Sequence, residues 1–109
     1  MVGYRWGWRR GGPGRPMKPR VVGEEPGIIR FVPIIPPEKV ENYRKEPIIM
    51  TPDELEALRL VDYMGLMQEE AAKRMGISRG TVWRCLDSAR RKVATMLVEG
   101  REITISTLT

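Results

Sequence analysis

The stretch QEEAAKRMGISRGTVWRCLDS, residues 68–88, decides the fold that we expect for this chain. Ala72 stands where two crossing helices would approach most closely, so a larger side chain there would push the helices apart. Further along, Gly76 can adopt the left-handed backbone conformation that ends a helix. Ser78 can then accept a hydrogen bond from a backbone N–H in the following turn, which makes it a good N-cap for a second helix. The spacing predicts two helices joined by a tight turn.

The second of these helices is predicted to have an apolar and a polar face. Its inward positions at helical spacing are Val82, Leu86, Ala89 and Val93, with Cys85 beside them. Its outward arc holds Arg79, Gly80, Trp83, Arg84 and Asp87. This arrangement is typical of a helix-turn-helix, in which the N-terminal half of the second helix enters the major groove of DNA. Double-stranded DNA is therefore the predicted partner, and a helical hairpin used only for packing is the alternative.

A further helix is predicted upstream of this pair. Thr51-Pro52-Asp53-Glu54 is a capping box, in which the threonine caps the helix, the proline takes the first helical position and the glutamate reaches back to the cap. An apolar stripe then supports a helix of about residues 53–64 that ends near Gly65. The last helix is predicted to run on until Gly100 stops it. Residues 51–100 thus form a predicted three-helix core in a mainly α fold.

Three stretches carry a resemblance to a known family: Thr51-Pro52-Asp53-Glu54-Leu55-Glu56-Ala57-Leu58-Arg59-Leu60, Gly65-Leu66-Met67-Gln68-Glu69-Glu70-Ala71-Ala72 and Ser88-Ala89-Arg90-Arg91-Lys92-Val93-Ala94. They resemble the small prokaryotic predicted DNA-binding proteins grouped as domain of unknown function 134, closely over residues 51–100 and more loosely from Gly14 to Arg20. The helix-turn-helix of that family is similar to region four of sigma factors, which reads promoter DNA. The resemblance implies DNA binding and a regulatory role, but no operator, inducer or target gene. Residues 1–13 look like an extension to which nothing from the family carries over.

Charge is distributed unevenly along the chain, although the overall excess of 19 Lys and Arg over 14 Asp and Glu is modest. Residues 1–22 hold six bases and no acid, and residues 73–92 hold seven bases and one acid. Residues 51–72 hold six acids and one base. A DNA-binding protein concentrates positive charge where phosphates lie, so the reading helix and the N-terminal segment are the predicted contacts. The acidic first helix is expected to lie away from DNA or to contact a basic partner, and the alternative is that it is only a solvated face.

The residues predicted to bind DNA are Ser78, Arg79, Gly80, Thr81, Trp83, Arg84, Asp87, Arg90, Arg91 and Lys92. Arg79 and Arg84 can each form a bidentate pair with guanine, or instead hold a phosphate. Gly80 would let the helix approach the groove closely, and Thr81 suits a phosphate contact or a local cap. Trp83 could touch a thymine methyl group or a sugar, or pack against the first helix or a partner.

The remaining polar positions of this helix also carry two interpretations. Asp87 could accept a hydrogen bond from cytosine N4, or form a salt bridge with Arg84 or Arg91. The basic run Arg90-Arg91-Lys92 spreads around the helix, which favours contacts to the DNA backbone over base reading.

Outside the core, four segments are distinguished by composition. Residues 1–22 form a basic arm that is predicted to be disordered, and its arginines could enter the minor groove or only add nonspecific affinity. Residues 23–50 contain a short strand candidate at 28–32 and a charged linker with room for one short helical turn. Residues 101–109 are predicted to be a strand or a tail. The two strand candidates could pair within one chain or between chains.

Enzymatic and metal-binding functions find little support in the composition. The chain has no His, the commonest general base and metal ligand, and its single Cys85 is expected to be a buried, inert thiol. The seven Met residues are expected to fill the core. We therefore predict no catalytic residue, cofactor or metal. A lone Cys and the absence of a long apolar run favour the cytoplasm over a membrane.

A core of this size is marginal alone, so a homodimer is predicted, with two reading helices one DNA turn apart, about 34 Å. The sequence thus favours a dimeric, sequence-specific transcription regulator. One alternative is an adaptor that binds a protein partner through the acidic first helix and the strand edges. Another is a nonspecific nucleic-acid binder that acts through the basic arm.

Overall fold

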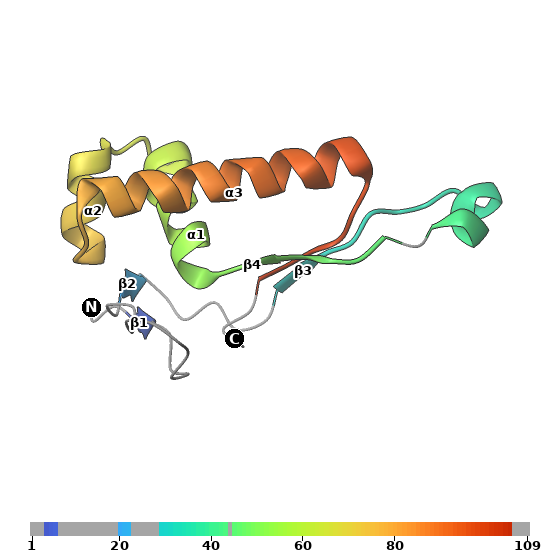
Figure 1. Cartoon of the computed structure of the whole chain (residues 1–109), viewed down its shortest axis with the longest axis horizontal. Helices are drawn as coiled ribbons and strands as arrows, with labels where there is room; N and C mark the ends of the chain where they lie inside the picture. The colour runs from blue at the N-terminus through green and yellow to red at the C-terminus, as the bar shows by residue number, and fades with distance from the viewer. Residues whose placement is uncertain (1–3, 7–19, 23–28, 44, 106–109) are drawn as a thin grey trace.

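The computed structural model describes residues 4–6, 20–22, 29–43 and 45–105. The elements of this part of the chain are β1 Tyr4–Trp6, β2 Arg20–Val22, β3 Ile29–Phe31, the 3-10 helix η1 Pro37–Asn42, β4 Ile48–Met50, α1 Pro52–Ala57, the π-helix η2 Leu58–Tyr63, α2 Gln68–Met75, α3 Arg79–Glu99 and β5 Ile103–Ile105. The long α3 runs along the molecule, with α1, η2 and α2 gathered around its N-terminal half and a small sheet below its C-terminal half (Figure 1). The mainly helical fold that the sequence predicts is confirmed at this level.

The first helix forms where the capping box predicts it. The backbone N–H of Thr51 donates to the Glu54 carboxylate at 2.8 Å, and the backbone N–H of Glu54 donates to the Asp53 carboxylate at 2.9 Å. The helix continues without a break from α1 into η2, whose π-helical turns were not predicted. It ends before Gly65, which has a φ of +77°. The predicted span of about 53–64 therefore agrees with the structure to within a residue or two.

The first of two core clusters lies beneath these helices, and its buried residues are Ala57, Leu60, Ala71, Ala72, Met75, Val82, Cys85 and Leu86. Ala72 is 6% exposed, as expected at a close crossing of two helices. The predicted inward face of α3 is confirmed, because Val82, Leu86 and Ala89 are fully buried and Val93 is partly buried. These contacts fix α2 and α3 relative to the first helix.

A second cluster joins α3 to a three-stranded sheet of order β3-β5-β4. Strand β5 pairs antiparallel with β3 (Ile29 opposite Ile105) and parallel with β4 (Met50 opposite Ile105). The two predicted strands therefore pair within one chain. The third strand, β4, was not predicted, because its alternation of buried and exposed residues lasts for only three positions.

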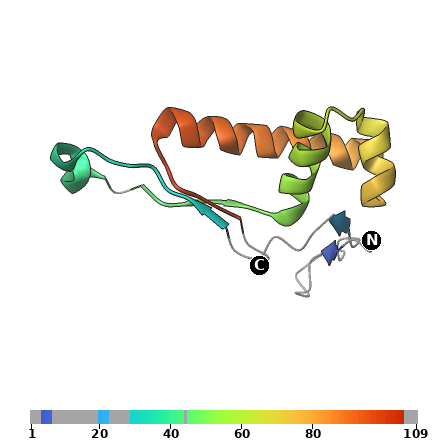
Figure 2. The ribbon, with the colours of Figure 1, turned by 180° about the vertical axis from the view of Figure 1, so that it is seen from behind.

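The described chain between β3 and β4, which we call the distal arm (residues 32–43 and 45–47), projects past the C-terminal end of α3 (Figures 1 and 2). Its returning limb is fastened to that end: the Tyr43 hydroxyl donates to the carbonyl of Gly100 at 2.6 Å, and Arg101 Nε donates to the carbonyl of Glu46 at 2.9 Å. The tip is η1, the short helical turn that the sequence allowed within a charged linker.

The N-terminal segment departs in part from its prediction. Strands β1 and β2 pair antiparallel, with Tyr4 opposite Val22 and Trp6 opposite Arg20. The sequence predicted disorder for residues 1–22 and did not indicate these two strands, Tyr4–Trp6 and Arg20–Val22. Backbone pairing of a few residues leaves little trace in a composition rich in Gly and Arg. The rest of this prediction concerns residues outside those that the structure describes.

Candidate functional site

The turn between α2 and α3 has the hydrogen bonds that a glycine C-cap predicts. Gly76 has a φ of +67°, its N–H donates to the carbonyl of Lys73 at 3.3 Å, and the N–H of Ile77 donates to that of Ala72 at 3.1 Å. These are the two bonds of a Schellman motif, which satisfies the last carbonyls of a helix. At the start of α3, Ser78 Oγ accepts the backbone N–H of Thr81 at 3.1 Å. Both predicted end signals are confirmed, and they set the angle at which α3 leaves α2.

The outer face of α3 is the set Arg79, Gly80, Trp83, Arg84 and Asp87, which the sequence predicted to point outward. The Arg79 side chain is 68% exposed, Trp83 is 48% exposed, and Gly80 and Arg84 are also exposed. Asp87 is half-buried and forms a salt bridge with Arg91 at 3.3 Å, one of its two predicted ion-pair partners. Thr81 is half-buried, and its hydroxyl lies 2.9 Å from that of Ser78, so it serves the local cap.

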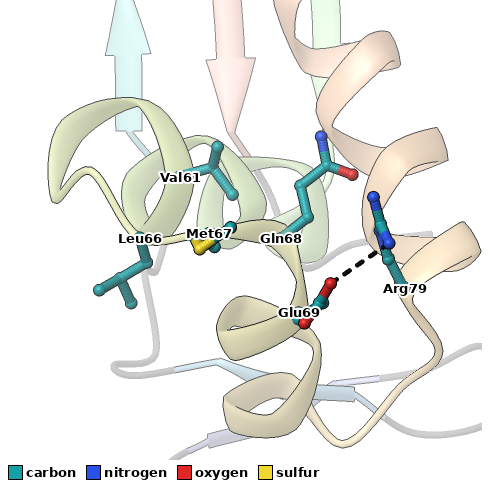
Figure 3. Close-up of a pocket in the computed structure, with 6 residues that line it drawn as sticks. All are labelled: Val61, Leu66, Met67, Gln68, Glu69 and Arg79. Atoms are coloured by element: carbon teal, nitrogen blue, oxygen red, sulfur yellow. Dashed lines mark hydrogen bonds and ion pairs between the residues drawn. The ribbon is translucent and has the colours of Figure 1, made fainter.

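The two arginines of the outer face differ in their surroundings. Arg79 lies 3.3 Å from the Glu69 carboxylate on α2, across the turn. A hollow of about 290 Å³ is lined by Val61, Leu66, Met67, Gln68, Glu69 and Arg79. Figure 3 shows Glu69 and Arg79 pointing toward one another among these side chains. Arg84, in contrast, has no hydrogen-bond or ion-pair partner among the described residues. Its guanidinium could therefore meet a ligand without first leaving a carboxylate of the described residues.

Two of the three residues predicted to contact the DNA backbone, Arg90 and Lys92, form hydrogen bonds within the chain itself. Arg90 donates two hydrogen bonds to Asp62, at 2.9 and 2.7 Å. The hydrogen bond from Arg90 holds the pKa of Asp62 below its ordinary value. Lys92 Nζ lies 2.7 Å from both the Glu54 carboxylate and the carbonyl of Ile49. Arg91 is the most exposed residue of this run, with 80% of its side chain exposed, and it forms an ion pair with Asp87, one turn earlier on the same helix.

The acidic first helix is not the solvated face that the sequence suggested. Asp53, Glu54 and Glu56 are 4%, 8% and 4% exposed. Glu56 accepts two hydrogen bonds from Arg59, each of 2.8 Å, while Glu54 pairs with Lys92 and also accepts the hydroxyl of Ser88. A buried carboxylate is stable only with such partners. Glu54 and Asp53 thereby join the first helix to α3, whereas Glu56 pairs with Arg59 within the first helix itself. All three carboxylates are buried, so little of their surface is left for a basic partner.

Glu54 is the centre of this network and was missed as such by the sequence, which assigned it only to the cap. Burial opposes its charged form, but hydrogen bonds from Lys92, Ser88 and the Thr51 backbone outweigh burial and lower its pKa. Each partner from α3 lies more than thirty positions away along the chain, at |i−j| of 34 and 38. No local spacing rule reports a contact of that range.

The described residues offer few groups for thiol chemistry or metal binding. Cys85 is buried, with its sulfur 3.5 Å from the Asp53 carboxylate. Within the described residues, no three His, Cys, Asp or Glu side chains are grouped so that they could hold a metal ion. In the same part of the chain, no helix combines the length and the apolar character needed to cross a bilayer.

Comparisons with known proteins agree on the family. A family model described as protein of unknown function DUF134 matches residues 8–107. A UPF0251 protein of Pyrococcus abyssi is 63% identical over 86 residues, covering 79% of this chain and 76% of the relative. A UPF0251 protein of Pyrococcus furiosus is 58% identical over 96 residues (88% and 86%), and one of Methanococcus vannielii is 45% identical over 93 residues (84% and 68%). No solved structure matches this chain. The chain therefore belongs to the family described as protein of unknown function DUF134, whose archaeal members include these UPF0251 proteins.

Proposed function

We propose that the chain binds double-stranded DNA sequence-specifically, as a homodimer, and that it regulates transcription in the cytoplasm. In this proposal α2, the turn and α3 act as a helix-turn-helix of the kind found in sigma region four, and the outer face of α3 enters the major groove. The residues proposed to reach base edges are Arg79, Arg84 and Trp83. Arg91 is proposed to hold a phosphate, since its side chain extends from the same side of α3.

Gly80 is the observation that carries the proposal. An added Cβ at this position would meet nothing closer than Ser78 Oγ at 4.0 Å, so packing within the described chain does not require a glycine. Glycine costs about 0.5–1 kcal/mol relative to alanine in the middle of a helix, and less in the first turn of α3, where Gly80 lies. A partner surface that must approach the helix closely would explain a glycine at this position despite that cost. The base edges of a DNA groove, read by the arginines on either side of Gly80, are such a surface.

The adaptor alternative loses its main support from the burial of Asp53, Glu54 and Glu56. The alternative of nonspecific binding through the N-terminal arm is separated from the proposal by a selection experiment. The full-length protein is incubated with a random duplex library at about 0.15 M salt, where nonspecific phosphate binding is weakened, and the retained DNA is sequenced. We expect enrichment of an inverted repeat. Retention without enrichment, or no retention at all, would contradict the proposal.

Substituting Gly80 by alanine is expected to separate stability from DNA binding. The helix should become more stable by up to about 1 kcal/mol, because alanine has less conformational entropy to lose and the position has room for a Cβ. Affinity for the selected duplex should fall, because the methyl group would stand between the helix and the groove. Thermal unfolding and fluorescence anisotropy measure the two quantities on one sample. Unchanged affinity with raised stability would mean that Gly80 does not face DNA.

A further inference from the structure

An acidic side chain from α2 lies against the outer face of α3. Glu69 is in the first turn of α2, and its Oε1 is 3.3 Å from Nη1 of Arg79, the first residue of α3. The two side chains point toward one another (Figure 3), and both are exposed, Glu69 to 66% and Arg79 to 68%. A carboxylate at this place would repel the phosphates of a DNA duplex that approached α3.

The next residue, Glu70, shows that this contact does not follow from the position in the helix. Both glutamates suit the first turn of α2, because negative charge is favourable near the N-terminal end of a helix. Glu70 pairs with Arg74 on α2 itself, at 3.6 Å, whereas Glu69 reaches across to α3. The stability of α2 therefore explains the charge of both residues but not the partner of Glu69.

Arg79 likewise gains little from its place at the start of α3. The helix dipole opposes a cation in the first turn, and α3 has no acid in its own first turn to offset that cation. Glu69 supplies the missing negative charge from α2. Because an ion pair as exposed as this one contributes little to stability, its main effect concerns what Arg79 can bind.

We propose that Glu69 is a specificity-determining residue, which holds the Arg79 guanidinium back from DNA phosphates and releases it only to a base edge. This inference rests on the proposed function, because it concerns the same outer face. If Arg79 left Glu69 for a phosphate, one anion would replace another, and the carboxylate would remain beside phosphates that it repels. If Arg79 left Glu69 for guanine, it would gain a bidentate contact, and the carboxylate would lie beside uncharged base edges.

Arg84 is the contrasting case on the same face. It is exposed and has no hydrogen-bond or ion-pair partner among the described residues, so it is available to the phosphates of any sequence. Glu69 keeps Arg79 from adding a second contact of that kind. Specificity is the difference between two affinities, so weaker binding to wrong sequences raises it as effectively as tighter binding to the right one.

The substitution Glu69→Gln tests this role, with the full-length protein, the selected duplex and a scrambled duplex in fluorescence anisotropy. On the scrambled duplex the released Arg79 should bind one more phosphate. At about 0.15 M salt this corresponds to about fivefold tighter binding, with a salt dependence steeper by about 0.9. On the selected duplex Arg79 contacts a base in both proteins, so only the cost of separating an exposed ion pair is saved, which is about twofold. The ratio of the two affinities should therefore fall.

Two controls separate this effect from a change of net charge. Glu70→Gln removes the same charge one residue further along α2 and releases Arg74, so it should change both affinities by the same factor. In an Arg79→Ala background, Glu69→Gln should leave the ratio unchanged, because Glu69 acts through Arg79. Thermal unfolding should be nearly the same for all of these proteins, since the substituted side chains are exposed.

The remaining outcomes overturn the role of Glu69. Equal changes on the two duplexes in Glu69→Gln, or a change of the ratio that persists without Arg79, would show that Glu69 does not act by restraining this arginine. Weaker binding to the selected duplex alone would mean that Glu69 itself contacts a base. All of these results leave the discrimination by the wild-type protein, and with it the proposed function, in place. If the selection enriches no duplex, the proposed function fails and the role of Glu69 fails with it.

Discussion

Replacing Lys92 by methionine is expected to lower the free energy of unfolding by about 3 kcal/mol at neutral pH. This figure is the lower end of the range for removing one partner of a buried ion pair, chosen because 28% of the Lys92 side chain is exposed. The substitution would leave the Glu54 carboxylate, 11% exposed, without its ammonium partner. Chemical denaturation followed by circular dichroism measures the loss.

The loss should depend on pH in a direction that the pKa of Glu54 sets. In the wild-type protein this pKa is below its ordinary value of 4.5, so the stabilisation is present above that value and disappears as the pH falls through the folded-state pKa. In the variant the hydrogen bonds from Ser88 and the Thr51 backbone remain but the contribution of Lys92 is lost, so the pKa of Glu54 should be higher than in the wild-type protein and less stability should be lost in acid. The two proteins should therefore differ most at neutral pH and approach one another in acid.

Arg91→Met is the matched control for this experiment. Arg91 is the preceding residue, has the same charge and also forms an ion pair, but 80% of its side chain is exposed. Exposed pairs contribute little, so the control should lose less than about 1 kcal/mol. If Lys92→Met were as mild as Arg91→Met, Lys92 would not be the structural counter-ion described here, and its sequence-based role as a phosphate contact would regain support.

The double substitution of Arg79 and Arg84 by alanine is expected to produce the largest loss of DNA affinity. Each bidentate contact to guanine contributes about 1–3 kcal/mol of discrimination, so the pair could weaken binding to the selected site by two orders of magnitude or more. Arg84→Ala alone should account for much of this loss. Its side chain has no partner among the described residues to leave, whereas Arg79 must first separate from Glu69. Fluorescence anisotropy against the selected duplex and a scrambled one measures affinity and specificity together.

Arg74→Ala removes the same charge from α2 and is the matched control. The Arg74 side chain is 51% exposed and pairs with Glu70, one turn earlier on the same helix. Its loss should weaken both duplexes slightly and equally, as expected for a general electrostatic contribution. If the double variant also weakened both duplexes equally, Arg79 and Arg84 would hold phosphates and would not read bases. Unfolding curves should be nearly unchanged in all three proteins, because these side chains are exposed.

Much of the helical part could be predicted because its signals are local. The capping box before α1, the glycine after α2, the serine before α3 and Gly100 after it each satisfy backbone groups within a few residues of themselves. Helical periodicity likewise identified the buried face of α3. Such patterns depend on neighbours along the chain, so the sequence contains them in full.

The contacts that were missed join positions far apart in the chain. The sequence did not indicate that Lys92 would meet Glu54, that Arg90 would meet Asp62, or that Ile48–Met50 would lie parallel to Ile103–Ile105. A basic residue on a helix has the same local pattern whether it faces a phosphate or a buried carboxylate. The packing of α3 across the first helix decides between these roles.

The sequence by itself therefore determined where the helices begin and end, which side of α3 is buried, and which five residues form its outer face. These properties follow from caps and periodicity, which act within one or two helical turns. Only the tertiary structure decided which of the basic residues remain available to a ligand, because that depends on which carboxylates the fold brings beside them. It likewise decided that the distal arm projects from the body, since the hydrogen bonds from Tyr43 and Arg101 that hold its returning limb in place exist only once α3 has packed against the sheet.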